Sequence, residues 1–580
     1  MIYSKWKTRL ILACFLQVIS SSFAAQELCP KVTLHGKISF TDTEKRLICG
    51  DKELEAYRKI PTYQASFMLK GFLQSRGYLR PNFIKEGEIL HVHRGSRSKV
   101  RSLLVLSDDP DLSKKIQKKL RRFYRKRILD TGTLNAIEAE AKALGRQNGH
   151  PCIKIKSHVD INTDQVTVSV DQLASHPFGL VDQEEIEGVY PEALARYYPF
   201  DEEMLFNEDL LRLTEKRLTR SEVVQGTYFL EECSSDLKSF KLSQRFITGP
   251  PRTLRFGAGA SSEVGPLARA KWSHNRLGSM ASTLSATLQA SLRSQSLLIS
   301  SDTYFWKHRP RRSLFAQAEL LRESQIDFEQ SLLRLRPHMK WSFDDEKRQG
   351  IITFGPSYEG GQFLTKDKSQ TRHFSTGIIE GSLQLMSHIY ELFDIHPQDG
   401  DLFNFSFDFR HPGLGFSDET LKLDSSFAKL SHLGNTGRGS IIGGLRFSAG
   451  TTWVRETVDP ASLPPVLKFY GGGSDDIRGF LLRTLPRSDG RGALSKVGLK
   501  LEIRRTHLWK DSIEAFSFVD SAYFGDRSWS TSSQLFTSPG IGLRWLSPIG
   551  LVQSYVSRGL SLHPSEDFGN FYFIGLGGVF

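Results

Sequence analysis

Residues 403–410 read FNFSFDFR, with a phenylalanine at every second position and a polar or charged residue between them. Successive side chains of a β-strand point to opposite faces, so this segment predicts a strand with one aromatic and one hydrophilic face. Residues 284–293 alternate in the same way, with leucine and alanine on one face and serine, threonine, glutamine and arginine on the other. Lipid on one side and a wet lumen on the other would suit both segments, which is the pattern of a transmembrane barrel.

Short alternating strands with polar turns continue over residues 248–580, after a boundary near Gly249-Pro250-Pro251. A soluble β-sandwich also alternates, but this region would need several such domains, and no linkers divide it. At roughly 20 residues for each strand with its share of turns, the region holds about 16 antiparallel strands. The mean hydropathy of −0.31 agrees with an all-β transmembrane barrel, because lipid-facing and lumen-facing residues average out.

The N-terminus has basic residues, an apolar run over residues 10–19, and then Ser22-Phe23-Ala24. These features predict a signal peptide over residues 1–24, because the apolar run is shorter than the roughly 20 residues that a membrane-spanning helix needs. Export separates the chain from nucleic acid. The formal net charge of +13 therefore does not indicate a nucleic-acid partner.

Between the predicted signal peptide and the barrel, a helix, a glycine and a strand recur three times. Glycine after the last helical residue supplies the left-handed conformation that ends a helix. We expect three α+β domains over residues 25–96, 97–174 and 175–247, followed by the barrel over residues 248–580. Their helices are expected at residues 65–76, 134–148 and 210–225.

A further helix is expected in the second of these domains, with a strongly basic face. The basic face could contact anionic lipid head groups or an acidic partner, or it could simply be solvated. The basic residues are Lys114, Lys115, Lys118, Lys119, Arg121, Arg122, Arg125, Lys126 and Arg127.

The chain has five cysteines, of which Cys14 lies in the predicted signal peptide. Export would bring Cys29, Cys49, Cys152 and Cys233 into an oxidising compartment, where four cysteines allow three pairings. Cys29 with Cys49 is the local candidate disulfide and would add roughly 3 kcal/mol by constraining the unfolded chain. Buried free thiols are the alternative.

A long segment at about 454–496 separates two expected strands and contains GGGSDDIRGF at residues 471–480. Its Ile477-Arg478-Gly479-Phe480 resembles the (Val/Ile)-Arg-Gly-(Phe/Tyr) motif of the BamA and TamA superfamily. These outer-membrane assembly and translocation proteins combine periplasmic POTRA domains with a C-terminal 16-stranded barrel. In that family the motif lies in the sixth extracellular loop, which folds back into the barrel.

The resemblance implies that Arg478 contacts the inner wall at Glu502 and Asp520. A guanidinium withdrawn into a lumen loses water, and two carboxylates within reach would restore charge balance and orient its donors. An exposed loop arginine is the alternative.

The resemblance covers the mature chain, and three POTRA-like domains are more similar to the TamA branch than to BamA or the two-partner secretion transporters. It implies an outer-membrane location with the N-terminal domains in the periplasm. The implied partners are outer-membrane lipids, unfolded outer-membrane or secreted client proteins, and a TamB-like protein anchored in the inner membrane. A BamA-type insertase and a two-partner-secretion-type transporter remain as alternatives.

The last strand has an apolar face formed by Tyr572, Ile574, Leu576 and Phe580. Such terminal aromatic strands resemble the signal by which barrels are recognised for assembly. The expected first strand contains two glycines, which weaken a strand interior. We expect the seam between the first and last strands to be the weakest place in the wall, and to open sideways for a client strand. The two glycines are Gly257 and Gly259.

Catalytic motifs are missing from the sequence: it contains no GxSxG, HExxH, P-loop or GxGxxG pattern. We therefore expect no enzyme activity, no catalytic residue and no cofactor. His91 and His93 alternate on one expected strand, but a lone pair of this kind is usually a solvated face, so no metal is expected. A passive porin or a barrel-anchored hydrolase is a less favoured alternative, since neither accounts for both the three domains and the inward loop.

Overall fold

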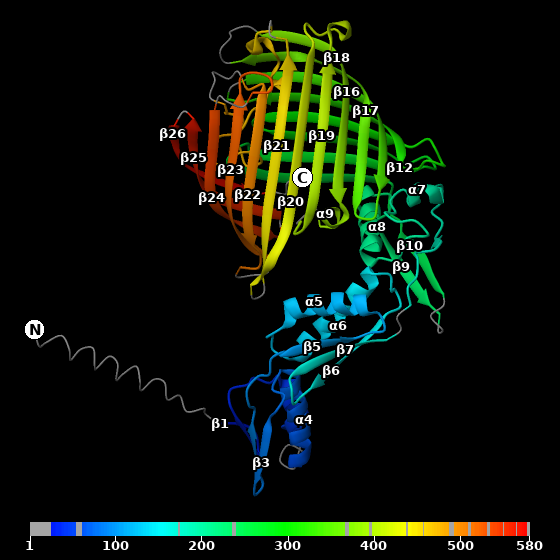
Figure 1. Ribbon diagram of the computed structural model, residues 1–580, viewed down its shortest axis with the longest axis vertical. Coiled ribbons are helices and arrows are strands. Elements are labelled where there is room, and N and C mark those ends of the chain that lie inside the picture. The colour runs from blue at the N-terminus through cyan, green and yellow to red at the C-terminus, as the bar shows by residue number, and fades with distance from the viewer. Residues whose placement is uncertain are drawn as a thin grey trace, which may run out of the picture. The chain divides into compact units, whose positions relative to one another are not determined.

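The computed structural model describes residues 25–53, 61–171, 174–234, 239–326, 328–365, 371–393, 397–436, 439–455, 458–486, 492–508, 512–530, 534–548, 550–563 and 565–576. Residues 1–24, where the signal peptide is predicted, and Phe580 lie outside this description. The chain divides into two compact units (Figure 1). The first unit is built mainly from residues up to Pro177, and the second mainly from the residues after it.

Module 1 of the first unit is a sheet with the strand order β1-β2-β4-β3, covered by two helices. Helix α2 begins with a capping box, in which Thr41 and Glu44 each accept a hydrogen bond from the other's backbone amide. Leu69 and Leu73 of α4 are fully buried and form the core with the sheet. The elements are β1 (Ala25–Cys29), β2 (Val32–His35), α2 (Asp42–Cys49), α4 (Thr62–Ser75), β3 (Asn82–Glu86) and β4 (Ile89–His93).

Module 2 has the strand order β5-β7-β6, with β5 and β7 parallel. The basic helix α5 buries Ile116 and Leu120 and exposes most of its charged residues. It ends at Tyr124, earlier than expected, because Arg125 is extended and Lys126 has a left-handed φ of 68°. The basic residues from Arg125 to Arg127 therefore follow the helix. The elements are β5 (Ser102–Leu106), α5 (Pro110–Tyr124), α6 (Thr131–Gln147), β6 (Lys154–Asp160) and β7 (Gln165–Asp171).

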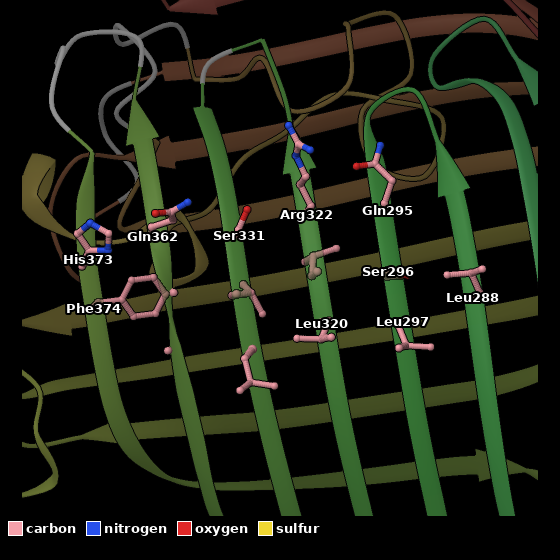
Figure 2. Close-up of a pocket in the computed structure, with 15 residues that line it drawn as sticks. Leu288, Gln295, Ser296, Leu297, Leu320, Arg322, Ser331, Gln362, His373 and Phe374 are labelled. Atoms are coloured by element: carbon pink, nitrogen blue, oxygen red, sulfur yellow. The ribbon is translucent and has the colours of Figure 1, made fainter.

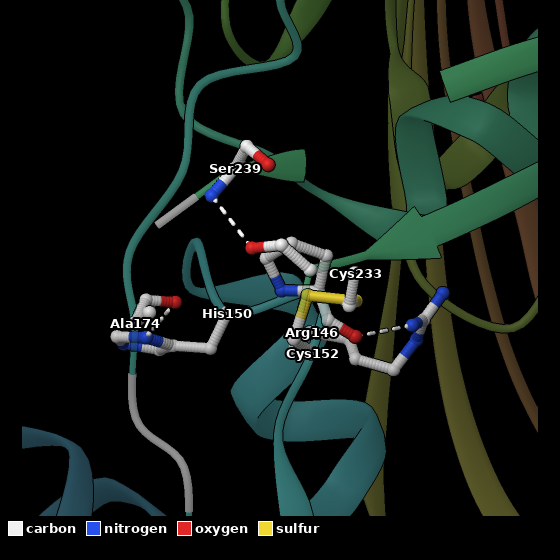
Figure 3. Close-up of a disulfide and its surroundings, with 8 residues drawn as sticks. Arg146, His150, Cys152, Ala174, Cys233 and Ser239 are labelled. Atoms are coloured by element: carbon white, nitrogen blue, oxygen red, sulfur yellow. Dashed lines mark hydrogen bonds between the residues drawn. A yellow bond between two sulfur atoms is a disulfide. The ribbon is translucent and has the colours of Figure 1, made fainter. Parts of the chain in front are cut away.

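Two disulfides involve the four cysteines that follow the predicted signal peptide. Cys29 is bonded to Cys49, joining β1 to the end of α2. Cys152 is bonded to Cys233, at a sequence separation of 81 (Figure 3). The second pairing closes a long loop of chain, which is the kind of cross-link that most restricts the unfolded state in the chain-entropy account.

Module 3 has the strand order β8-β10-β9 and belongs to the second unit, together with the barrel. Its long helix α8 ends at Ser221, short of the expected residue 225, because Glu222 has a left-handed φ of 58°. All three modules thus have two helices followed along the chain by an antiparallel pair of strands. The elements are β8 (Val181–Gln183), α7 (Pro191–Ala195), α8 (Glu208–Ser221), β9 (Gly226–Cys233) and β10 (Phe240–Ile247).

Strands β11 to β26 form a closed antiparallel barrel in chain order (Figure 1). This confirms the predicted fold class of α/β modules followed by a 16-stranded barrel. The strands are β11 (Arg252–Ser261), β12 (Gly265–Leu277), β13 (Ser282–Ser291), β14 (Ser294–Thr303), β15 (Arg312–Ser324), β16 (Phe328–Asp344), β17 (Arg348–Thr365), β18 (Arg372–Ser387), β19 (Gly400–Arg410), β20 (Thr420–Thr436), β21 (Gly439–Val454), β22 (Ser495–Arg505), β23 (Ile513–Gly525), β24 (Gln534–Ser547), β25 (Gly550–His563) and β26 (Ser565–Leu576).

The barrel wall is apolar outside and polar inside, as its alternation predicts. Leu288 and Phe354 are exposed on the outer face, whereas Thr287 and Ser357 are buried inside. A soluble protein seldom exposes so many large apolar side chains over one surface, so this wall is suited to lipid. Among the described helices, none combines the length and apolarity needed to cross a membrane.

Candidate functional site

The segment between β21 and β22, residues 455–494, is called the inward loop below, because the described residues around Arg478 lie inside the barrel. Its Ile477, Phe480 and Leu485 are almost completely buried. They pack with Phe524 of β23 and Phe536 of β24, whose side chains point into the lumen. The loop therefore has a small apolar core of its own against one side of the wall, and this core holds the motif in place.

Asp520 of β23 binds one edge of the Arg478 guanidinium with both of its carboxylate oxygens. Nε donates to Oδ2 at 2.7 Å and Nη2 to Oδ1 at 2.8 Å, and the Arg478 backbone amide also donates to Oδ2 at 3.1 Å. Asp520 is 0% exposed. Two parallel charge-assisted bonds fix both distance and orientation, which a lysine could not reproduce.

Glu502 of β22 binds the remaining nitrogen of the same guanidinium, Nη1, and also binds a second arginine. Its Oε2 accepts from Arg478 Nη1 at 2.7 Å, and its Oε1 accepts from Arg544 Nη1 at 2.7 Å. The guanidinium carbon of Arg478 lies 3.5 Å from the centroid of the Phe518 ring. That of Arg544 lies 4.2 Å from the Phe516 ring. Two cations, two carboxylates and two aromatic faces thus form one balanced cluster, in which the rings add cation–π stabilisation.

Arg544 and the two phenylalanines are absent from the sequence-based prediction. Arg544 alternates with Leu543 and Trp545, both exposed outside, so the period of the strand places it in the lumen. The pattern could not show that Arg544 of β24 lies beside Glu502 of β22, because these two strands are not adjacent.

The glycine after Arg478 is required by close packing against the wall. Gly479 has a φ of +101°, and a Cβ there would lie 2.2 Å from the Ser538 hydroxyl oxygen. Across from it, a Cβ on Gly559 of β25 would lie 2.7 Å from the Gly479 carbonyl oxygen. A side chain at either position would push the motif away from the wall, so these glycines set the depth at which Arg478 enters.

The seam between β11 and β26 is described up to Leu576. Leu576 pairs with Ala260 and Gly575 with Ser261, and the Ser262 amide donates a hydrogen bond of 3.0 Å to the Ile574 carbonyl. On its other edge, β11 pairs with β12 from Arg252 to Ser261, and this pairing includes Gly257 and Gly259.

The inward loop touches both sides of this seam. On the β11 side, Ser474 donates a hydrogen bond of 2.9 Å to Glu263, which lies in the hairpin after β11. On the other side, the Phe480 ring lies 5.2 Å from the Phe568 ring of β26, in an edge-to-face arrangement. Moving β11 away from β26 would separate these contacts, so the loop is coupled to the seam.

The outer face of β26 is formed by Tyr572 and Ile574, which are 67% and 63% exposed, and by Leu576. Phe573 points inward and stacks on Tyr555 of β25, with ring centroids 4.8 Å apart. Phe580, which the sequence analysis places on the same outer face, lies outside the described residues.

Module 3 is attached to the barrel rim by buried ion pairs. Arg217 of α8 donates to Glu391 at 2.7 and 2.9 Å and to Asp344 at 2.8 Å. Farther round the rim, Arg196 donates to the carbonyl oxygens of Met280 and Ala281, at 2.7 and 2.8 Å. Breaking buried pairs of this kind is costly, so they hold module 3 firmly to the barrel.

Glu222, in the turn after α8, holds the beginning of β11. It accepts hydrogen bonds from Thr253, Ser273 and Asn275, at 2.8 to 2.9 Å, and pairs with Arg255 at 2.5 Å. Burial alone would raise the pKa of this carboxyl, but the hydroxyl hydrogen bonds and the nearby Arg255 and Lys271 outweigh burial and lower the pKa. Glu222 is therefore charged at neutral pH and ties β11 and β12 to module 3.

We expect Glu222→Ala to loosen the beginning of β11 without unfolding the barrel. Its hydrogen-bond donors on β11 and β12 would lose their acceptor, at a cost of about 1 to 3 kcal/mol. Hydrogen–deuterium exchange should then accelerate at Thr253 to Arg255 and stay unchanged in β17. Because the pKa of Glu222 is lowered in the folded state, its stabilisation is present above the unfolded pKa of roughly 4.3 and is lost as the pH falls through the folded value. Unchanged exchange at these amides would contradict this role.

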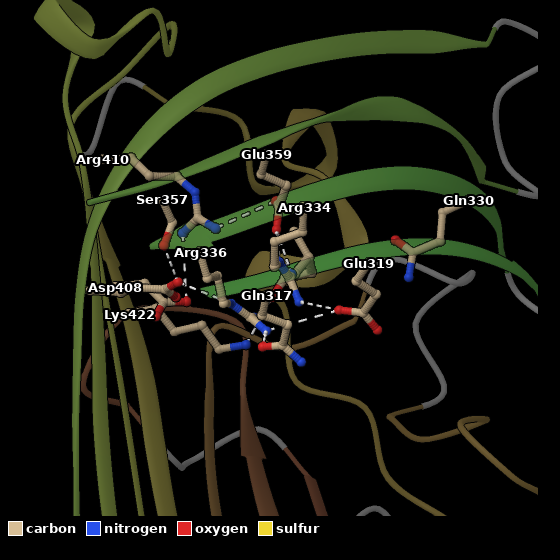
Figure 4. Close-up of polar contacts among 12 residues, drawn as sticks. Gln317, Glu319, Gln330, Arg334, Arg336, Ser357, Glu359, Asp408, Arg410 and Lys422 are labelled. Atoms are coloured by element: carbon tan, nitrogen blue, oxygen red, sulfur yellow. Dashed lines mark hydrogen bonds and ion pairs between the residues drawn. The ribbon is translucent and has the colours of Figure 1, made fainter. Parts of the chain in front are cut away.

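The lumen wall on strands β15 to β20 carries a dense network of paired charges (Figure 4). Glu359 pairs with Arg334 and Arg410, and Glu380 pairs with Arg336 at 2.9 Å. Lys422 of β20 donates to the Val466 carbonyl of the inward loop at 2.8 Å. The loop is thus held from both sides of the lumen, by Arg478 on one wall and by Lys422 on another.

Metal binding finds no support in the described part of the chain, which contains no suitable group of three or more His, Cys, Asp or Glu side chains. His91 and His93 lie beside His35 of β2. The His35 ring stacks on His93 and is within hydrogen-bonding distance of His91, at 3.3 Å. The three imidazole rings therefore contact one another on one face of the module 1 sheet.

Comparison with known proteins finds one family match, over part of the chain. The match is to the Omp85 superfamily domain, over residues 364–575. This stretch contains strands β18 to β25, the inward loop and the whole Arg478 cluster. The Omp85 match therefore falls on the part of the barrel in which the motif and its wall partners lie.

Several solved structures resemble the chain at low identity. BamA from Haemophilus ducreyi lacking POTRA domains 1–3 is 14% identical, with 83% of this chain and 100% of that chain covered and a TM-score of 0.49. CdiB from Acinetobacter baumannii is 12% identical, with coverages of 98% and 97% and a TM-score of 0.46. CdiB from Escherichia coli is 12% identical, with coverages of 88% and 95% and a TM-score of 0.47. Similarity this distant says nothing about what the present chain assembles or transports.

Proposed function

We propose that this protein is an outer-membrane assembly or translocation factor that passes client polypeptides through the seam between β11 and β26. The observation that carries the proposal is the contact of the inward loop with both sides of this seam, at Glu263 after β11 and at Phe568 of β26. Through these contacts the loop that contains Arg478 would respond when β11 and β26 separate. Gly257 and Gly259 also weaken the interior of β11.

The edge of β11 has the properties of a template for a client strand. When β11 and β26 separate, the backbone groups on this edge of β11 would lose their partners on β26. An added client strand would satisfy these groups by β-augmentation, and it would be released into lipid sideways. The free energy would come from client folding and from burial of its apolar face, so no catalytic group is needed. We therefore propose a non-enzymatic function without a cofactor.

Module 3 gives this template a fixed base. Glu222 holds the start of β11, and Arg217 and Arg196 hold the module itself to the rim. The described part of β26 has no comparable bond to module 3. We therefore propose that the seam opens by movement of β26 while β11 stays in place.

The domain assignment supports the same function. We propose a signal peptide over residues 1–24, POTRA-like domains over 25–96, 97–174 and 175–247, and a barrel from residue 248. The repeated order of one strand, two helices and two strands supports the three POTRA-like domains, which would lie in the periplasm. Three such domains favour a TamA-like role with a TamB-like partner over a BamA-type insertase or a two-partner-secretion-type transporter.

Photo-cross-linking tests the template role directly. Benzoylphenylalanine replaces either Phe256 of β11, 78% exposed beside the seam, or Phe354 of β17, 48% exposed on the same outer surface far along the strand order. We expect client polypeptides to be cross-linked from position 256 and not from position 354, in cells that synthesise the full-length protein. Equal cross-linking from both positions, or none from either, would contradict the proposal.

A further inference from the structure

The outer surface of the barrel has a shallow depression across strands β13 to β18 (Figure 2). Its volume is about 730 Å³. It lies at the barrel end where β13 joins β14 and β15 joins β16. The turn after β12 is at the opposite end, where it contacts module 3. The depression belongs neither to the seam nor to the inward loop.

A row of hydrogen-bond donors runs along the upper margin of this depression. The members are directly opposite one another in the strand register, one on each strand from β14 to β18, and all face outward. Arg322 is the charged member, and His373 contributes an imidazole ring. The remaining side chains carry amide or hydroxyl donors. The row consists of Gln295, Arg322, Ser331, Gln362 and His373.

The charge of this row is positive and uncompensated within it. No described carboxylate lies within ion-pair distance of Arg322 or His373. Glu329 is one step closer to the loops on the same face, where it accepts a hydrogen bond from Ser324 at 3.2 Å. A free cation on a lipid-facing wall is tolerated near the membrane interface, at about 0 to 1 kcal/mol, and not at the midplane. The row therefore marks the height of lipid head groups.

Directly below, the next outward row is apolar. Leu297, Leu320 and Leu333 lie opposite one another on β14, β15 and β16, and Gly360 follows on β17. The Tyr358 side chain covers this glycine, since a Cβ there would lie 2.9 Å from the Tyr358 hydroxyl oxygen. The row of leucine side chains forms a surface against which a hydrocarbon chain can lie.

We infer that this depression binds a single lipid with an anionic phosphate head group, in the membrane leaflet opposite module 3. The donor row would bind the phosphate oxygens, with Arg322 as the charged contact. An acyl chain would lie along the leucine row. The combination of donors above and hydrocarbon below selects an acylated phosphate, because free phosphate would use only the upper row.

Native mass spectrometry of the detergent-solubilised full-length protein tests this site. The probes are dioleoyl phosphatidic acid and dioleoyl phosphatidylcholine, which share acyl chains and differ in net head-group charge. We expect the wild type to retain phosphatidic acid about five-fold better, the effect of roughly one basic residue near an anionic lipid. Arg322→Gln should abolish this preference, and Leu320→Gln should weaken retention of both lipids by interrupting the leucine row.

Arg312→Gln is the matched control, because Arg312 faces outward on the same strand at its other end. This variant should keep the wild-type preference, and the heat-dependent gel shift of a folded barrel should be unchanged in all three variants. Equal retention of both lipids by the wild type, or the same preference in Arg322→Gln as in Arg312→Gln, would overturn the inference. Displacement of phosphatidic acid by millimolar inorganic phosphate would also overturn it, since the site would then be one for a free anion.

Discussion

A disulfide between Ser261→Cys and Gly575→Cys is expected to abolish client insertion while leaving the barrel folded in the membrane. Ser261 and Gly575 lie opposite each other across the seam. A Cβ built at Gly575 lies 3.6 Å from the Cβ of Ser261. Disulfides form at Cβ separations of 3.5 to 4.5 Å, so the bond needs little backbone movement. Once β11 and β26 are covalently joined, a client strand cannot enter between them.

The control for this experiment uses the same glycine. Gln553 of β25 lies opposite Gly575 on the other side of β26, so Gln553→Cys with Gly575→Cys joins two strands without crossing the seam. Client assembly in cells should stop only with the seam pair and should return on reduction. Both variants keep Cys29–Cys49 and Cys152–Cys233, so reduction affects these native bonds equally. Undiminished assembly with the oxidised seam pair would rule out the lateral route.

Arg478→Ala is expected to leave the barrel inserted and to impair client assembly severely. The substitution leaves Asp520 buried without a cation and leaves Glu502 with Arg544 alone. Removing one partner of a buried pair costs about 3 to 5 kcal/mol, because the remaining charge is no longer compensated. The inward loop should then leave the wall and lose its contacts at Glu263 and Phe568, so limited proteolysis should cut within residues 458–486.

Arg455→Ala provides a matched control in the same loop. Arg455 pairs with Glu419 at 2.9 Å, but its side chain is 62% exposed. An exposed pair contributes about 0 to 1 kcal/mol, so protease resistance and client assembly should both stay near the wild-type level. If Arg478→Ala were as active and as protease-resistant as Arg455→Ala, the buried cluster would have no functional role.

The fold class follows from the sequence because strand alternation depends only on the local period of two. The segments at residues 284–293 and 403–410 show an apolar face and a polar face without any knowledge of their neighbours, and both are strands of the wall. The motif around Arg478 was recognised by its resemblance to a family motif. The reason that a glycine must follow the arginine is not local, because Gly479 packs against Ser538 and Gly559 of the wall.

The helix ends were less predictable. Helices α5 and α8 stop before the expected residues because Lys126 and Glu222 adopt left-handed conformations, which neither residue type signals. The disulfide pairing was also open, because all three pairings of four cysteines are compatible with the sequence. Which cysteines meet depends on the arrangement of β1, α2 and the ends of modules far apart in the chain.

The sequence by itself determined which residues face lipid, which face the lumen, and where the loop with Arg478 lies. Only the tertiary structure decided which partners each inward charge meets. Arg544 of β24 binds Glu502 of β22, although these strands are not adjacent. Glu222 of module 3 holds β11, and the described part of β26 pairs with β11 at Ala260 and Ser261. These features depend on the stagger of the strands round the closed barrel, and stagger is set by the sum of all registers rather than by any single segment.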